Sequence, residues 1–259
     1  MKLKLYQIDA FASKVFEGNP AAICPLDEWL DESIMQNIAM ENNLAETAFF
    51  VKSGKHYDIR WFTPNKEVNL CGHATLASAH VIFNILEEES NSITFNSKSG
   101  LLHVQKDTEI ITMNFPAELP IACDTPQAII DAFGKTPVEV LKCVDYIVVF
   151  DDYEGLEQFS PNLELLKTLD LRGVCITSKD KKYDFVSRFF APNYAIDEDS
   201  VTGSAYTQLI PYWSNKLQKT SLYSKQVSSR GGELRCELKS NRVYISGTAV
   251  SYLKAEIEI

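Results

Sequence analysis

Residues 57–65 read YDIRWFTPN, and residues 183–193 read YDFVSRFFAPN. The two stretches share a tyrosine, an aspartate, an arginine, a phenylalanine, a proline and an asparagine in the same order, 126 to 128 positions apart. That offset is close to half of the 259-residue chain. Because self-similarity at a fixed spacing indicates a duplicated architecture, we expect each half of the chain to fold as a copy of one unit.

Two further pairs of segments repeat in the same order. CGHA at 71–74 matches TGSA at 202–205, and SGLLHV at 99–104 matches GGELRC at 231–236. The prolines of FPAELP (115–120) interrupt the strand pattern between the copies. We therefore expect an N-terminal half over 1–117 and a C-terminal half over 118–259.

Each half has the pattern of a sheet with one dominant helix. Strands are predicted at about 3–9, 47–52, 56–63, 92–96, 101–105 and 110–115, and then at about 144–149, 173–177, 183–191, 233–238 and 242–248. Helices are predicted at about 32–42, 74–86, 161–169 and 204–217. The segment after His73 is apolar or small nearly all round, which is typical of a helix buried inside a curled sheet. The fold class is α+β: two pseudo-symmetric halves, each a curved, mostly antiparallel, barrel-like sheet around a central helix.

The composition narrows the class of protein. With 25 basic and 35 acidic residues the net charge is −10, which repels nucleic acid and anionic membrane surfaces. The six cysteines are scattered without a CxxC pair, so we expect free thiols and no zinc site. The N-terminus alternates polar and apolar residues, and no 18-residue apolar run occurs. These features predict a cytoplasmic protein that binds neither nucleic acid nor membranes.

The start of each central helix is a candidate binding site. Gly72 and Gly203 stand where free backbone N–H groups and the positive end of the helix dipole favour an anion. The copies differ beside these glycines: Cys71 faces Thr202 in the alignment, and His73 faces Ser204. Positions that both copies share serve the scaffold, whereas those that differ are candidates for function.

One carboxylate from each half is a candidate for proton transfer. Glu46 lies among apolar neighbours, a setting suited to a general base. Counting eleven residues back from Tyr57 reaches Glu46, while the same count from Tyr183 reaches Arg172. The second half instead has an acidic insertion that ends at Asp199.

Each candidate also has a purely structural interpretation. Glu46 could lie at the rim in solvent, and Asp199 and Ser200 could cap the helix. His73 could be a satisfied buried histidine, and Cys71 a small buried apolar residue. The remaining histidines show no metal-ligand spacing, and no GxSxG, Walker or GxGxxG motif occurs. We expect no metal.

Several motifs together resemble one known family. They are QIDAFA (7–12), EGNPAAI (17–23), AETAFFV (45–51), RWFTPNKEVNLCGHATLASAHV (60–81), EDSVTGSAY (198–206), SSRGGELRCEL (228–238) and VYISGTAV (243–250). In this order they resemble the PhzF family of phenazine biosynthesis, which has the diaminopimelate epimerase-like fold. The resemblance spans the whole chain. It implies two pseudo-symmetric halves, an active site between them, no cofactor and a homodimer.

The resemblance also implies roles for particular residues. The family's proton-shuttling glutamate falls on Glu46, its histidine on His73, its aspartate on Asp199 and its serine on Ser204. Residues expected to contact the substrate are Asn19, Cys71, Gly72, Thr202 and Gly203. Diaminopimelate epimerases carry opposed thiols at both helix starts, whereas this chain has a thiol only at the first, which favours a single glutamate base.

The expected reaction is a cofactor-independent isomerisation of a small carboxylate-bearing metabolite. Two departures from the family pattern are Ala45, where a serine often precedes the glutamate, and Ser200, where a proline often follows the aspartate. Neither removes a catalytic group, but they leave the substrate open. The alternatives are a racemase, epimerase or dehydratase that uses Cys71, and a metabolite-binding protein without turnover.

Overall fold

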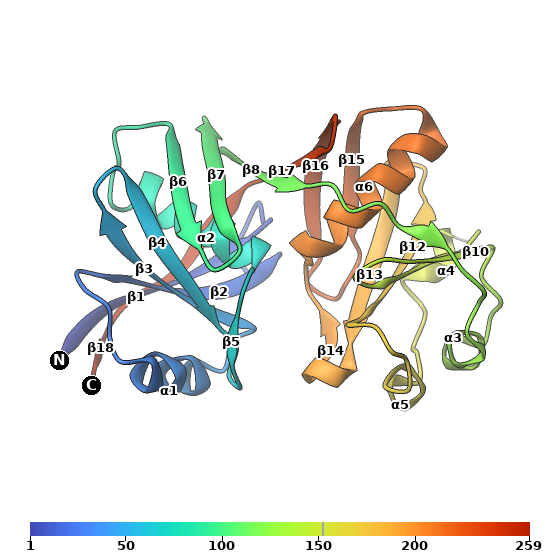
Figure 1. Cartoon of the computed structure of the whole chain (residues 1–259), viewed down its shortest axis with the longest axis horizontal. Coiled ribbons are helices and arrows are strands. Elements are labelled where there is room, and N and C mark those ends of the chain that lie inside the picture. Colours follow the sequence, from blue (N-terminus) through green and yellow to red (C-terminus); the bar gives the residue numbers. More distant parts are fainter. Residues whose placement is uncertain (152) are drawn as a thin grey trace. The chain divides into compact units, whose positions relative to one another are not determined.

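The computed structural model describes residues 1–151 and 153–259, which form two compact units. Unit 1 comprises Met1–Phe115 with Ile245–Ile259, and unit 2 comprises Pro116–Tyr244. This differs from the expected division, which placed the C-terminal segment in the second half. The reason is that strand β18 (Ala249–Glu258) pairs antiparallel with β1 (Lys2–Ala10), so the two ends of the chain lie side by side (Figure 1).

Unit 1 is built on one curved sheet. Its remaining strands are β2 (Asn19–Leu26), β3 (Glu46–Ser53), β4 (His56–Phe62), β5 (Glu67–Val68), β6 (Ser92–Ser97), β7 (Gly100–Asp107) and β8 (Ile110–Pro116). The pairing order is β18, β1, β2, β3, β4, β6, β7, β8, with β5 beside β4. Only β2 with β3 and β4 with β6 are parallel among these pairs. The predicted fold class is confirmed.

Helix α2 (Gly72–Asn84) is the core of unit 1. Every residue from Gly72 to Phe83 is buried, and the helix packs against β1, β2, β3, β7 and β18 (Figure 1). Its mixture of alanines and branched apolar residues lets strands approach from all sides. Helix α1 (Glu32–Asn42) packs against part of the same sheet by the face that carries Met35 and Ile38. Both helices occur where the sequence predicts them.

Unit 2 has the same kind of sheet and its own central helix. Its strands are β9 (Ile121–Ala122), β10 (Glu139–Lys142), β11 (Tyr146–Val149), β12 (Val174–Lys179), β13 (Phe185–Ala191), β14 (Ile196–Asp199), β15 (Ser221–Gln226) and β16 (Gly232–Lys239), followed by β17 (Arg242–Gly247), which continues into unit 1. Its helices are α3 (Gln127–Phe133), α4 (Tyr153–Leu156), α5 (Leu163–Leu166), the short 3₁₀ turn Pro192–Tyr194 and α6 (Gly203–Leu217). The helix expected over 161–169 is therefore much shorter than predicted.

The strand pairings repeat between the units. In unit 1 the succession β2–β3, β3–β4, β4–β6 and β6–β7 is parallel, antiparallel, parallel, antiparallel. In unit 2 the succession β11–β12, β12–β13, β13–β15 and β15–β16 has the same directions in the same order. The central helix follows the equivalent hairpin in each unit. The duplication predicted from the repeat is confirmed.

The pairing register aligns the two copies residue by residue. The phenylalanine that the repeats share is Phe62 in β4 and Phe190 in β13. Phe62 lies opposite Thr47, and Phe190 lies opposite Val174. Thr47 and Val174 are therefore equivalent positions.

The register corrects one position of the sequence alignment. Since Glu46 precedes Thr47, its counterpart is Gly173 and not Arg172. The count along the chain failed because Tyr183 is not the register counterpart of Tyr57: Tyr57 lies five residues before Phe62, whereas Tyr183 lies seven residues before Phe190. Arg172 lies one residue before the position equivalent to Glu46.

Proline 211 lies inside α6 without ending it. Since proline has no N–H, the carbonyl of Thr207 loses its helical donor. That carbonyl instead accepts a hydrogen bond from the backbone N–H of Glu118 at 3.0 Å. The helix can therefore continue to Leu217. Among the described residues, no helix has both the length and the apolarity needed to cross a membrane.

The enclosure of α2 predicts which substitutions destabilise unit 1. Leu76 is fully buried in this helix, whereas Leu101 on β7 is 60% exposed. We expect Leu76→Ala to lower the free energy of unfolding by about 2–5 kcal/mol, because the cavity it leaves is closed in on all sides. The matched control Leu101→Ala should change it by less than about 0.5 kcal/mol. Urea unfolding followed by circular dichroism measures both, and equal losses would contradict the enclosed core.

Candidate active site

Three elements of unit 1 bring polar side chains to the N-terminal end of α2. The parallel pairing of β2 and β3 sets Ala21 opposite Glu46, so Asn19 and Glu46 lie at the starts of adjacent strands. Cys71 is the N-cap residue of α2, and His73 is in its first turn. The structure thus brings together all the site residues predicted in this half.

His73 is the centre of this cluster. Its Nδ1 lies 3.3 Å from the amide nitrogen of Asn19 and 3.5 Å from Sγ of Cys71. Its Nε2 lies 3.2 Å from Oε2 of Glu46. Because the Asn19 amide donates to Nδ1, a neutral ring carries its proton on Nε2, facing Glu46. The glutamate and the histidine are therefore placed to exchange a proton.

The contact between Glu46 and His73 is close, but it is not a hydrogen bond. The two atoms are close enough for an ion pair, but their angles do not make a hydrogen bond, and Nε2 finds none among the described residues. The two side chains are 13% and 6% exposed. A buried polar atom without a partner costs free energy unless a ligand or water satisfies it. Glu46 is thus not a rim residue in open solvent, and His73 is not a satisfied structural histidine.

Burial and charge set the protonation of the cluster. Burial raises the pKa of the Cys71 thiol to about 11, and the charge of Glu46 raises it too. Cys71 is therefore a neutral thiol near pH 7. Burial alone would lower the pKa of His73, but its anionic neighbours outweigh this and raise the pKa above the usual value. Since a neutral thiol contributes no charge, we attribute that rise to Glu46.

Glu46, Cys71 and His73 also offer one metal-ligand atom each, and these atoms lie within 4.8 Å of one another. These are donor types that zinc uses. Cys71 contacts Nδ1 of the ring, however, while Glu46 contacts Nε2, so the other two side chains meet different nitrogens of the His73 imidazole. The absence of a metal stays a prediction.

The start of α6 carries the site residues predicted in unit 2. Thr202 is the N-cap residue, and its side chain makes no capping bond to the helix. Its hydroxyl instead donates to Asp199 at 2.6 Å, and its backbone N–H donates to Gln226 at 2.8 Å. Ser204 follows in the first turn of the helix. Asp199, Thr202, Gly203 and Ser204 therefore lie together at this helix end.

Sequence reasoning left Arg172 without a role, but the structure places it beside Ser204. Nη2 of Arg172 donates to Oγ of Ser204 at 3.0 Å. The guanidinium also binds the carboxylate of Asp145 through Nε at 2.8 Å and Nη2 at 2.6 Å. One sequence signal pointed to Arg172: it lies eleven residues before Tyr183, the same spacing that separates Glu46 from Tyr57.

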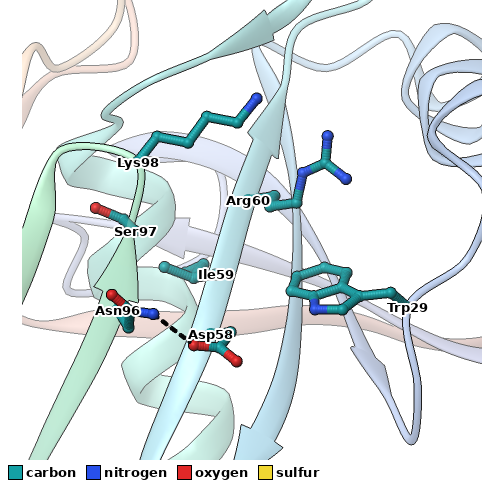
Figure 2. Close-up of a pocket in the computed structure, with 7 residues that line it drawn as sticks. All are labelled: Trp29, Asp58, Ile59, Arg60, Asn96, Ser97 and Lys98. Atoms are coloured by element: carbon teal, nitrogen blue, oxygen red, sulfur yellow. Dashed lines mark hydrogen bonds between the residues drawn. The ribbon is translucent and has the colours of Figure 1, made fainter.

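A separate hollow of about 360 Å³ lies on unit 1 (Figure 2). Its lining residues are Trp29, Asp58, Ile59, Arg60, Asn96, Ser97 and Lys98, none of which is a predicted site residue. Its cations are already paired: Arg60 binds Glu32 and Glu67, and Lys98 also contacts Glu67. This hollow is therefore not the candidate active site.

Comparison with known proteins agrees with this fold. The family described as phenazine biosynthesis-like protein matches residues 8–255. An uncharacterized isomerase of Pseudomonas aeruginosa is 47% identical over 259 residues, with both chains covered in full. A crystal structure of a PhzF-family phenazine biosynthesis protein from Enterococcus faecalis superposes with a TM-score of 0.98 at 46% identity, again with both chains covered in full.

A more distant structure shows the wider fold. A hydroxyproline epimerase from Agrobacterium vitis matches 99% of this chain and 92% of its own with a TM-score of 0.64 at 10% identity. Fold and relatives together define an enzyme of the isomerase class. The chain belongs to the PhzF family.

The environment of Cys71 predicts its reactivity. With a pKa of about 11, the thiolate fraction at pH 8 is roughly one in a thousand, so alkylation by iodoacetamide should be slow and should rise towards pH 11. Because the charge of Glu46 raises that pKa, Glu46→Gln should move the pH profile of Cys71 alkylation to lower pH. Peptide mass spectrometry measures both rates.

Cys143 in unit 2 is the internal control for this experiment. Its thiol should react at the same rate in both proteins, since burial within its own unit is the largest cause of its raised pKa. Fast alkylation of Cys71 at pH 7, or an unchanged profile in the variant, would contradict this account.

Proposed function

We propose that this enzyme moves a proton on a small carboxylate-bearing metabolite with Glu46 as the single base. The observation that carries the proposal is the contact of Glu46 with His73, at the N-terminal end of a buried helix. A carboxylate held beside an imidazole, with little exposure to solvent, is a common arrangement for general acid–base catalysis.

The proposed reaction begins with removal of a proton. Glu46 takes it from a carbon that a neighbouring carbonyl, carboxylate or diene activates, and the substrate becomes an enolate-like anion. The backbone N–H groups at the start of α2, beginning with Gly72, are oriented to stabilise such a charge. Glu46 then returns the proton to another carbon. The product is an isomer, so no atom is gained or lost and no oxidant is required.

His73 and Asn19 position the base in this proposal. Asn19 fixes the ring of His73 through Nδ1, which directs Nε2 towards Glu46. A protonated Nε2 can donate to Glu46 or to an oxygen of the substrate. Asp199, Thr202 and Ser204 of unit 2 are proposed to bind polar groups of the same substrate.

A reaction that relies on Cys71 is the rival mechanism. A thiol with a pKa of about 11 is a poor base at neutral pH, and Thr202 stands where a second thiol would be needed. Both observations favour Glu46. If Cys71 were the base, a thiol reagent would inactivate the enzyme rapidly. The Cys71→Ser variant would not be inactivated by the reagent.

Replacement of Glu46 tests the proposed base. Glu46→Gln keeps the shape of the side chain and removes its ability to accept a proton. We expect incorporation of solvent deuterium into a pool of small carboxylic acids to fall by roughly 10²–10⁴-fold. Mass spectrometry of the pool measures the exchange. Glu41→Gln, on the exposed end of α1, is the matched control and should exchange as the wild type does.

The outcomes of that experiment separate the candidate functions. Wild-type exchange in Glu46→Gln would show that Glu46 is not the base. No exchange in the wild-type protein, with binding of an acid retained, would favour a metabolite-binding protein without turnover.

Replacement of Asp199 tests whether unit 2 contributes to the proposed reaction. Asp199→Asn keeps an oxygen that can accept from Thr202 but removes the charge. We expect the exchange rate to fall by roughly tenfold or more, because hydrogen bonds to a charged carboxylate are stronger than those to an amide. Asp197→Asn, an exposed neighbour on the same strand, is the control. Equal exchange rates in the two variants would remove Asp199 from the proposal.

A further inference from the structure

Arg172 is held in one orientation by a buried carboxylate. Asp145 is fully buried, and its two carboxylate oxygens bind Nε and Nη2 of Arg172. Gln208 donates to the same carboxylate at 2.7 Å and accepts from the backbone N–H of Asp145 at 3.1 Å. The ring of Phe189 lies 5.4 Å from the guanidinium carbon. These contacts fix the plane of the guanidinium before any ligand arrives.

The fixed guanidinium keeps unused donors on its outer edge. Nε and one N–H of Nη2 go to Asp145, and the other N–H of Nη2 goes to Ser204. Nη1 makes no hydrogen bond to any residue that the structure describes, and the arginine side chain is 32% exposed. This outer edge is therefore available to a ligand.

Ser204 adds a second donor beside Nη1. Its oxygen accepts from Arg172, so its hydroxyl proton remains available for a ligand. In unit 1 the equivalent first-turn position holds His73 beside Glu46, whereas in unit 2 it holds Ser204 beside Arg172. The same backbone arrangement thus carries the carboxylate of Glu46 in unit 1 and the guanidinium of Arg172 in unit 2.

We infer that Arg172 and Ser204 form a carboxylate-binding site in unit 2, with Nη1 donating to one oxygen of the ligand and the Ser204 hydroxyl donating to the other. A planar, two-oxygen anion matches two neighbouring donors, and arginine is suited to such paired recognition. The inference deepens the proposed function and rests on it only for the statement that the bound carboxylate belongs to the substrate.

The charges that face Arg172 set the selectivity of this site. Asp145 offsets the guanidinium charge from behind, and the charge of Asp199 also acts on it. A ligand with a single carboxylate is therefore favoured over a polyanion, which the acidic neighbours would repel.

Titration with benzoate tests the inference directly. The probe is benzoate, compared with benzamide, which has the same shape and no charge. We expect the wild-type protein to bind benzoate at least roughly tenfold more tightly than benzamide, because hydrogen bonds to a charged group are stronger. The signals of the backbone amides of Gly203 and Ser204 should shift on benzoate addition in ¹H–¹⁵N NMR spectra. This measurement needs no variant, so a folding defect cannot obscure it.

Substitutions then assign the binding to Arg172. Arg172→Lys keeps a charge for the buried Asp145 but loses the second nitrogen of the fork, and should weaken benzoate binding by roughly tenfold. The double variant Arg172→Gln with Asp145→Asn removes both charges together, so that neither is left buried alone, and should abolish the preference for benzoate over benzamide. Arg235→Lys, an exposed arginine of β16, is the control and should bind as the wild type does.

The results distinguish this site from the proposed reaction. Deuterium exchange reports on Glu46, whereas the preference for benzoate over benzamide reports on Arg172 and Ser204. Retained deuterium exchange in Glu46→Gln would overturn the proposed base and leave the carboxylate site standing. Equal affinity of the wild-type protein for benzoate and benzamide, shifts that avoid the start of α6, or wild-type benzoate affinity in the folded double variant would each overturn the carboxylate site.

Discussion

A helix that is enclosed by a sheet can meet solvent only at its ends, and this constraint shapes unit 1. Because α2 is buried from Gly72 to Phe83, its polar backbone groups are accessible only at the first turn. The starts of β2 and β3 lie at the same end, since the two strands run parallel and in register. Any side chain at those two strand starts therefore meets the helix end, and Asn19 and Glu46 occupy these positions. The position of the chemistry follows from the packing of the helix.

The two units have the same backbone arrangement but carry side chains of opposite charge at the start of the central helix. Their strand pairings have the same directions in the same order, and each central helix begins with a glycine. At the equivalent first-turn position, one unit pairs His73 with a carboxylate and the other pairs Ser204 with a guanidinium. The shared residues preserve the packing, while the few that differ change the chemistry without changing the fold. A duplicated chain can acquire two different polar groups in this way at little cost in stability.

The duplication and most helix positions could be predicted from the sequence, because repeats and apolar periodicity are visible in the order of residues along the chain. The repeat predicted the duplication, and the helices at 32–42 and 204–217 occur nearly where expected. Strand β2 was missed because Pro20 and Pro25 interrupt its pattern, and its pairing with β1 and β3 is not local. The pairing of Arg172 with Asp145 could not be predicted either, since only the parallel sheet brings them together. The homodimer and the cytoplasmic location stay predictions.

The path of the backbone has a consequence for synthesis on the ribosome. Unit 2 is a continuous insertion, whereas unit 1 needs β18, whose residues 249–258 are translated after the whole of unit 2. Until that strand emerges, β1 lacks one neighbour and α2 lacks part of its cover. Vectorial folding would thus complete the inserted unit before the N-terminal one, the reverse of the usual order in multidomain chains. The first half of the nascent chain must therefore avoid aggregation until β18 has emerged from the ribosome.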